Sequence, residues 1–313
     1  MKLDAESYLQ TGSNELRVLE YRVNNMSFGV NILKVNKIVS DLTSLMSVPQ
    51  AHQAVCGVFR DMNRLVPVLD LALFLGIDAN DDSRKKVVMT EFFGTVTGLL
   101  VDRVDWIHHF KWEDVIDCES VFSGIDQRYV IGIVKPTEER MVLMLDYETI
   151  LLDLCPHLRS RDTSKYSGDA NFSGKKVLVA EDSPAVRSML VNEMSELGFE
   201  VVDCCDGAEA WRAYQESNFD LVISDVEMPQ MDGLALTLNI RQSERSSTPV
   251  IVYSSIGDVG MKSRAKFLKA DAHITKLNLD KLINTADKLM RGEKLTDEEE
   301  PVEVGATETI EME

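Results

Sequence analysis

The stretch DLVISDVEMPQMDG, residues 220–233, predicts how the second half of this chain folds. Leu221, Val222 and Ile223 form an apolar run without the alternation of a half-exposed strand, which is typical of a strand buried on both faces. The run stops just before Asp225, and a Met-Pro-x-Met-Asp-Gly segment typical of a turn follows it. We therefore expect a buried strand that carries Asp225 at its carboxyl end.

Short apolar runs alternate with helical patterns throughout the second half. Five runs are predicted to be strands, at residues 175–182, 199–204, 219–225, 248–255 and 272–276. Apolar residues recur at helical spacing over residues 183–198, 207–217 and 279–290. Ser183 suits the N-cap of the first helix and Pro184 its first position. Repeated strand–helix units predict an α/β domain with a parallel sheet and helices on both faces.

The first half has a different pattern, dominated by short strands. Residues 16–35 predict a hairpin with Asn24-Asn25 at its turn. Further runs rich in Val, Ile, Leu and Thr follow at residues 64–71, 85–92, 95–104, 129–135 and 140–146. Short helices fit near residues 32–39, 70–76 and 147–154. Glycine-rich turns between short strands predict small, all-β barrels. A Ser-, Asp- and Gly-rich segment, residues 156–174, predicts a linker between the two halves.

Composition is that of a soluble globular protein, with 44% hydrophobic and 27% charged residues among 313, a length that accommodates two domains. The net charge is −19, and residues 293–313 contain nine acids but one lysine, which predicts an acidic disordered tail. An acidic chain without a basic stripe argues against nucleic-acid binding. We expect no secretory signal and no membrane span. The five cysteines form no Cys-x-x-Cys pair, so we expect free cysteines in a cytoplasmic protein.

Polar groups follow four of the five predicted strands of the second half. They are Glu181, Asp182, Asp225, Ser254, Ser255 and Lys276. The carboxyl ends of parallel strands meet at one edge of the sheet, where ligands bind. Three carboxylates at that edge repel one another, and Mg²⁺, which prefers oxygen ligands, removes the repulsion. With the metal bound, Asp225 can attack a phosphoryl group and become an aspartyl phosphate, while Lys276 and a serine hydroxyl contact the phosphoryl oxygens.

Residues 175–292 resemble the receiver domain of two-component response regulators, which implies a (βα)5 flavodoxin-like fold. The resemblance is carried by Glu181-Asp182, by Asp225 followed by MPxMDG, by Ser254 after PVIVY, and by Lys276. The family usually has proline after the lysine and an aromatic residue three positions before it, where this chain has Leu277 and His273. Coupling between the hydroxyl and aromatic positions can therefore differ here, or His273 can be a partly buried polar residue with no such role.

The receiver resemblance also implies a chemistry. It implies that a phosphohistidine kinase phosphorylates Asp225 to 4-aspartylphosphate, with Ser254, rather than Ser255, as the switch hydroxyl and Lys276 as the matching lysine. The same resemblance implies that Mg²⁺ is held directly by the carboxylates of Asp182 and Asp225, with Glu181 in support. It also implies that the backbone carbonyl of Glu227 is a further ligand to the metal.

Residues 14–155 resemble the CheW coupling domain of bacterial chemotaxis. The matching segments are FGVNILKVNKIV, GVF before RLVPVLDL, GLLVDRV, KWEDVID, YVIGIVK and MVLMLD. The resemblance implies two five-stranded β-barrels that bind the cytoplasmic tips of methyl-accepting chemoreceptors and the histidine kinase CheA. Trp106 and Trp112 are expected to pack inside this domain. A CheW-like domain joined to a receiver resembles the CheV proteins, which implies a cytoplasmic protein associated with membrane-bound chemoreceptor arrays.

One stretch of the first half departs from the CheW pattern. CheW-like chains often have Arg-Gly before the strand predicted at residues 64–71, and the arginine is implicated in receptor contact. This chain has Met62-Asn63 at that place, so Arg60 or Arg64 could supply the charge instead.

Three functions are consistent with these features. The first is an adaptor that couples chemoreceptors to CheA under the control of Asp225 phosphorylation. The second is a phosphate sink that drains phosphoryl groups from the kinase without changing coupling. The third is an aspartate-based phosphatase, but its Asp-x-Asp signature is absent because Glu227 occupies the second acid position. We therefore expect no independent substrate turnover.

Overall fold

The computed structural model describes residues 15–48, 52–62, 64–77, 86–116, 128–155, 172–255, 269–293 and 295. The chain divides into two compact units, formed mainly by residues 1–160 and mainly by residues 161–313. Nearly all of the predicted linker, 156–174, and of the predicted acidic tail, 293–313, lies outside the described residues, as does the segment 256–268.

The first unit contains a sheet whose strands follow the order β10-β11-β2-β1-β9 in the described residues. The bounds are β1 Glu15–Val23, β2 Met26–Asn31, β9 Arg103–Lys111, β10 Val130–Thr137 and β11 Arg140–Leu145. Strand β1 pairs antiparallel with β2, and Asn24 adopts a φ of 55° at the turn between them. Asparagine tolerates this left-handed conformation better than most residues, and the predicted hairpin is confirmed.

A second sheet of the same unit has the order β3-β7-β8-β6-β5-β4 within the described ranges. The bounds are β3 Val35–Val39, β4 Leu45–Met46, β5 Val55–Asp61, β6 Arg64–Asp70, β7 Lys86–Phe92 and β8 Thr95–Val101. It has six strands where the resemblance implied five, because the two-residue strand β4 pairs with the edge of β5. The prediction of a helix near residues 32–39 is wrong, because only Ile32–Lys34 form a single 3-10 turn, η1. The residues that follow form strand β3, whose β-branched residues pair with β7.

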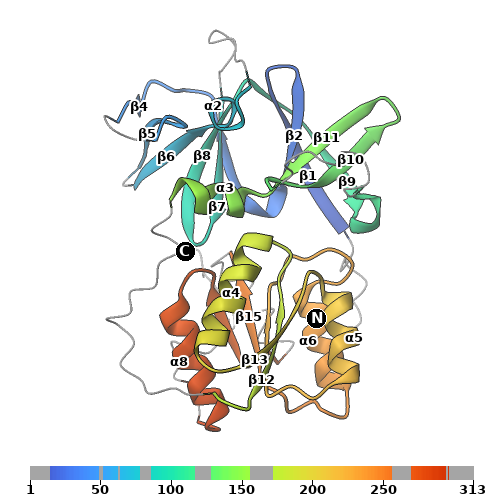
Figure 1. Ribbon diagram of the computed structural model, residues 1–313. Coiled ribbons are helices and arrows are strands. Elements are labelled where there is room, and N and C mark those ends of the chain that lie inside the picture. Colours follow the sequence, from blue (N-terminus) through green and yellow to red (C-terminus); the bar gives the residue numbers. More distant parts are fainter. Residues whose placement is uncertain are drawn as a thin grey trace, which may run out of the picture. The chain divides into compact units, whose positions relative to one another are not determined.

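The two short helices predicted near residues 70–76 and 147–154 are present, and both begin at aspartate caps. Helix α2 spans Leu71–Leu75 and helix α3 spans Tyr147–Leu154 (Figure 1). Asp70 accepts a hydrogen bond from the Leu73 amide, and Asp146 accepts one from the Thr149 amide. Tyr147, the first residue of α3, is buried, stacks on Phe92 and hydrogen-bonds through its hydroxyl to the hydroxyl of Tyr21. Helix α3 is thereby anchored in the main hydrophobic core of the first unit.

The second unit is a parallel sheet with helices on both faces, as predicted. Its strands follow the order β13-β12-β14-β15-β16 over the described residues, and every pairing is parallel. The bounds are β12 Lys176–Ala180, β13 Glu200–Cys204, β14 Leu221–Ser224, β15 Val250–Ser254 and β16 Ala272–Thr275. Burial on both faces explains the apolar runs, since all four residues of β14 are inaccessible to solvent.

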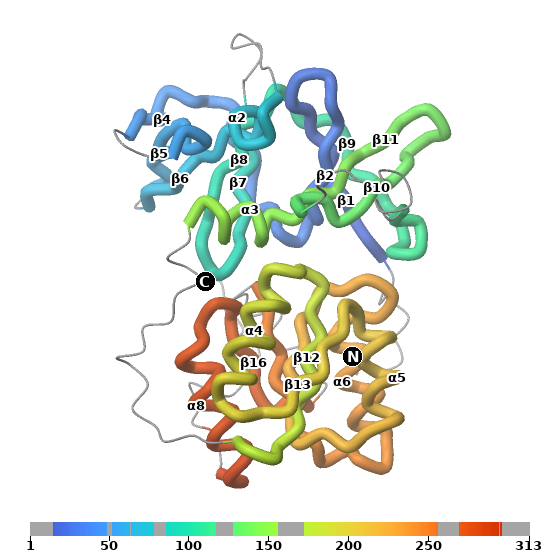
Figure 2. Tube along the Cα trace, in the orientation of Figure 1, coloured from blue at the N-terminus to red at the C-terminus, as the bar shows by residue number. Residues whose placement is uncertain are grey.

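Four described helices cover this sheet. They are α4 Pro184–Glu196, α5 Gly207–Glu216, α6 Gly233–Gln242 and α8 Leu279–Met290. Helices α5 and α6 lie together on one face, and α4 and α8 lie on the other (Figures 1 and 2). Phe172, near the end of the predicted linker, is buried and stacks on Phe199, so this unit begins at or before residue 172.

Candidate functional site

The predicted acids lie at the carboxyl edge of the parallel sheet. Glu181 and Asp182 directly follow β12, and Asp225 directly follows β14. These two strands are neighbours, and the strand order reverses between them, because β13 lies on the other side of β12. Such a reversal opens a crevice in a doubly wound sheet and is the usual position of a ligand.

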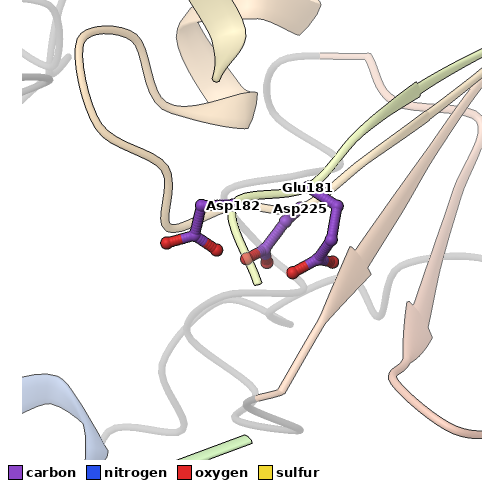
Figure 3. A group of neighbouring side chains, drawn as sticks. All are labelled: Glu181, Asp182 and Asp225. Atoms are coloured by element: carbon purple, nitrogen blue, oxygen red, sulfur yellow. The ribbon is translucent and has the colours of Figure 1, made fainter. Parts of the chain in front are cut away.

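The structure brings the three carboxylates into one group. One oxygen of each of Glu181, Asp182 and Asp225 lies within 4.8 Å of the others (Figure 3). Glu181 is fully buried, Asp225 is 3% exposed and Asp182 is partly exposed. An all-oxygen donor set with one member open to water fits Mg²⁺, which keeps several waters when bound. The residues present therefore fit the metal that the sequence predicted.

Lys276 follows β16 and reaches the same group. Its side chain is fully buried, and Nζ donates hydrogen bonds to Oε1 of Glu181 at 2.7 Å and to Oδ2 of Asp225 at 3.0 Å. A buried cation between two buried carboxylates offsets part of their mutual repulsion. The lysine therefore contacts one carboxylate oxygen of Asp225 directly.

Backbone contacts fix Asp225 at the strand end. Its amide donates to the Ala180 carbonyl at 2.8 Å, and its Oδ1 accepts from the Val226 amide at 2.6 Å. The hydroxyl of Ser224 donates to the Asp225 carbonyl at 2.8 Å. One carboxylate oxygen of Asp225 is thus held by the backbone while the other faces Lys276, which gives the side chain a single orientation.

Gly233 has a role that the sequence did not suggest beyond an ordinary turn. A Cβ at this position would lie 1.8 Å from the carbonyl oxygen of Asp225 and 2.7 Å from Oγ of Ser224. The neighbouring Asp232 caps helix α6 by accepting a hydrogen bond from the Ala235 amide at 2.6 Å. The Asp-Gly pair therefore starts α6 directly against the backbone of Asp225. The Met-Asp-Gly sequence after the acid was the available signal.

The two serines predicted at this edge are both buried. Ser254 is the last residue of β15, and Ser255 follows it. The Ser254 carbonyl accepts a hydrogen bond from the Lys276 amide at 2.9 Å. Glu227 lies in the loop after β14, two residues beyond Asp225. The switch role of the Ser254 hydroxyl and the metal contact of the Glu227 carbonyl stay predictions.

A contact behind Lys276 joins β15 to the loop after β16. The amide of Leu277 donates to the hydroxyl of Tyr253 at 2.6 Å, and Leu277 has a φ of 66°. The absence of proline at residue 277 is visible in the sequence, but no sequence feature pointed to Tyr253. His273 is 4% exposed, so it is a buried residue of β16.

The cysteines nearest the site are poor nucleophiles at neutral pH. The carbonyl of Cys204, at the end of β13, accepts a hydrogen bond from the Glu181 amide. Burial, followed by the negative charge of Glu209, raises the pKa of the Cys204 thiol to about 12. Burial and a hydrogen bond to Glu209 raise the pKa of Cys205 to about 11. Both thiols are therefore protonated at neutral pH.

In the first unit, the segment that departs from the CheW pattern is exposed at its described residue, Met62. Met62 follows β5 with a φ of 49° and is 86% exposed, while Arg60 and Arg64 beside it are also exposed. Asn63 lies outside the described residues. Trp106 is 66% exposed, so the expectation that it packs inside the domain is wrong, whereas Trp112 packs against a buried cluster that includes Leu16. Trp106 lies on β9, an edge strand whose side chains are less covered.

No helix in the described part of the chain is both long and apolar enough to span a membrane.

Comparison with known proteins confirms both predicted domain types. Residues 17–155 match the CheW-like domain family, and residues 177–287 match the response regulator receiver domain family. The chain is similar to the chemotaxis protein CheV3 of Helicobacter pylori, with 29% identity over 302 residues, covering 88% of this chain and 95% of the relative.

Two solved structures are each similar to one part of the chain. The scaffolding protein TtCheW from Thermoanaerobacter tengcongensis has 22% identity and a TM-score of 0.38, covering 42% of this chain and 88% of its own. A Francisella response regulator receiver domain has 28% identity and a TM-score of 0.36, covering 38% of this chain and 98% of its own.

Proposed function

We propose that this chain couples chemoreceptors to the histidine kinase CheA under the control of phosphorylation at Asp225. The chain is a chemotaxis protein of the CheV type, in which a CheW-like domain is joined to a response regulator receiver domain. The observation that carries the proposal is the contact of Lys276 Nζ with both Glu181 and Asp225, inside a group of three carboxylates at the strand-order reversal. This arrangement supports phosphoryl transfer to a carboxylate.

The reaction that these residues support is a transfer from a phosphohistidine. The Oδ2 atom of Asp225, the oxygen that faces Lys276, attacks the phosphorus and forms a new P–O bond. The P–N bond to the donor imidazole breaks, and the imidazole leaves as a neutral ring after taking up a proton from solvent. Asp225 becomes an acyl phosphate, and water later hydrolyses it to restore the carboxylate. No other substrate is consumed, so the protein is a phosphoryl acceptor rather than an independent enzyme.

The surrounding residues of the chain bind and orient the phosphoryl group. Lys276 neutralises one phosphoryl oxygen, and the Ser254 hydroxyl donates a hydrogen bond to another. Asp182 and Asp225, with Glu181 in support, and the Glu227 carbonyl would hold Mg²⁺, which would supply further charge neutralisation. The backbone hydrogen bond from the Val226 amide to Oδ1 keeps the attacking carboxylate fixed.

Phosphorylation replaces the single negative charge of the Asp225 carboxylate with a phosphoryl group that carries about −1.5 to −2 units of charge. The net gain of up to about one negative charge at a buried site is a local change that can shift a bistable element. We place this element in the loop around Ser254 and the helix that follows. Most of that element, residues 256–268, lies outside the described residues. The output is a change in how the CheW-like domain contacts the receptor tips or CheA, with Arg60 and Arg64 as candidate receptor contacts. The protein would accordingly be cytoplasmic and located at chemoreceptor arrays.

The experiment that tests regulation is a reconstituted receptor–kinase assay with intact protein and with Asp225→Asn. Kinase activity is measured with saturating coupling protein, before and after the receiver is phosphorylated. With intact protein, we expect kinase activity to change after phosphorylation. With Asp225→Asn, we expect kinase activity to stay at the level of the unphosphorylated protein before and after that step. Asp220→Asn, the same substitution at the opposite end of β14, is the control and should behave like intact protein.

The same assay separates the proposal from a phosphate sink. If coupling is identical with both proteins while only the intact protein drains phosphate from the kinase, the sink function is correct and the regulatory proposal is wrong. Sustained multi-turnover hydrolysis of a small phosphorylated metabolite would instead favour a phosphatase.

A further inference from the structure

The hydroxyl of Tyr253 holds the residue that follows the site lysine. Tyr253 is a fully buried residue of β15, and its hydroxyl oxygen accepts a hydrogen bond from the Leu277 amide at 2.6 Å. The next residue of the same strand, Ser254, accepts a hydrogen bond from the Lys276 amide at 2.9 Å. Two consecutive residues of β15 therefore bind the backbone on both sides of the Lys276 Cα.

The backbone at Leu277 needs such support. Its φ of 66° lies in the left-handed region, which is unfavourable for a leucine and readily adopted by glycine. A strained residue keeps such a conformation when neighbouring contacts hold it in place. The Tyr253 hydroxyl is such a contact, because it bonds the amide of the strained residue itself.

The conformation of Leu277 sets the path of the chain on either side of it. Before it, Lys276 extends its buried side chain to Glu181 and Asp225. After it, Asn278 caps helix α8 by accepting a hydrogen bond from the Lys281 amide at 3.2 Å. A rotation at residue 277 would move Lys276 relative to α8 and change where Nζ lies between the two carboxylates.

We propose that Tyr253 is a positioning residue for Lys276, acting through the Leu277 amide to fix the lysine ammonium at the Asp225 carboxylate. The inference rests on the proposed function for its kinetic consequence, since Lys276 is taken to neutralise the transferred phosphoryl group. The role assigned to Tyr253 is one of position and requires no contact with that group. Proline at residue 277 would have no amide hydrogen and could not adopt this φ, so this way of fixing the lysine requires a residue other than proline there.

The first test is the rate of phosphorylation by acetyl phosphate, a small donor that needs no kinase contact, at saturating Mg²⁺. Tyr253→Phe removes the hydroxyl and keeps the ring, and we expect the rate to fall about fivefold to tenfold, the size of a lost hydrogen bond. Tyr214→Phe is the matched control, because Tyr214 is equally buried and its hydroxyl bonds the Arg245 carbonyl and Thr248 instead. The control should phosphorylate at the wild-type rate.

Rescue by glycine distinguishes positioning from general destabilisation. Glycine adopts a φ near 66° without strain, so adding Leu277→Gly to Tyr253→Phe should recover at least about half of the lost rate. A general packing defect would not be repaired by removing the leucine side chain. A wild-type rate for Tyr253→Phe, or a reduced rate that Leu277→Gly leaves unchanged, would overturn the proposal.

A second measurement does not depend on phosphorylation. The melting temperature of the receiver domain is compared for Tyr253→Phe, Lys276→Met and the double variant. If Tyr253 acts through Lys276, the decrease in melting temperature caused by Tyr253→Phe should be smaller by about half or more when Lys276→Met is already present. Additive losses would contradict the inference. If wild-type protein accepts no phosphate at all, the proposed function fails, and this comparison alone still decides the role of Tyr253.

Discussion

The ammonium nitrogen of Lys276 lies 2.7 Å from Oε1 of Glu181, and both side chains are completely buried. A buried ion pair adds little stability compared with apolar residues, but removing one partner leaves an uncompensated charge. The pair is therefore better explained by the proposed phosphorylation of Asp225, which Lys276 also contacts at 3.0 Å.

Lys276→Met should destabilise the receiver domain and impair its reaction. The change leaves Glu181 and Asp225 buried without their cation, so the free energy of unfolding in EDTA should fall by about 3–5 kcal/mol. Phosphorylation by acetyl phosphate should slow by about 100-fold, because a charge that stabilises the transition state is lost. Denaturant titration and rate measurement check the two effects. Lys175→Met, which removes an exposed ion pair with Asp220, should cost at most about 1 kcal/mol, and equal losses would contradict this account.

Gly233→Ala should displace the backbone at the candidate nucleophile. The new methyl group would lie 1.8 Å from the Asp225 carbonyl oxygen, so the chain must move, at a cost of about 1–3 kcal/mol or more. We expect a lower melting temperature and slower phosphorylation together. Gly292→Ala is the comparison, since its Cβ meets nothing within 4 Å and only its φ of 69° is unfavourable. A Gly233→Ala protein with unchanged phosphorylation would show that the close contact does not matter.

Mg²⁺ should stabilise the receiver domain, and Asp182→Asn should remove most of the effect. A ligand that binds the folded state at about 100 times its Kd adds about 2.7 kcal/mol to the free energy of unfolding. Asp182 is the partly exposed member of the acid group, so its substitution should leave the fold intact. Thermal melts with Mg²⁺ and with EDTA measure the difference. An equal Mg²⁺ effect in the Asp182→Asn protein would place the metal elsewhere.

Glu20 should make the stability of the CheW-like domain depend on pH. Burial by itself would raise the pKa of Glu20, but hydrogen bonds from His108 and Arg140 outweigh it, so the pKa lies below its usual value of 4.5. Its contribution is therefore present above pH 4.5 and lost as the pH falls through the folded-state pKa. Glu20→Gln should lower the melting temperature at pH 7. The difference in melting temperature between the wild type and the variant should become smaller below pH 4.5. A difference that stays constant between pH 7 and pH 3 would contradict the assignment, and exposed Glu15→Gln is the control.

The parallel sheet could be predicted because its strands are buried on both faces, so that runs such as residues 221–223 contain no polar positions. The convergence of Asp225, Glu181 and Lys276 followed from the strand ends alone, since parallel strands bring their carboxyl ends to one edge. These features depend on local pattern and on a general rule of topology.

Features that depend on pairing between distant segments could not be predicted in this way. Strand β4 has two residues and exists through its pairing with β5, and β3 is a strand because it pairs with β7. The clash that makes Gly233 necessary involves a backbone atom eight residues earlier, and the bond from Leu277 to Tyr253 spans 24 residues. Neither contact leaves a periodic signal in the sequence.

The most direct test of the central claim is the transfer of labelled phosphate from phosphorylated CheA to the full-length protein in Mg²⁺. We predict that the wild type acquires acid-labile label, as expected for an acyl phosphate, and that hydroxylamine releases it. Asp225→Asn should acquire less than about 1% of that label, because the amide is not a nucleophile for phosphorus. Asp220→Asn should be labelled like the wild type. Labelling of Asp225→Asn at the wild-type level would contradict the account.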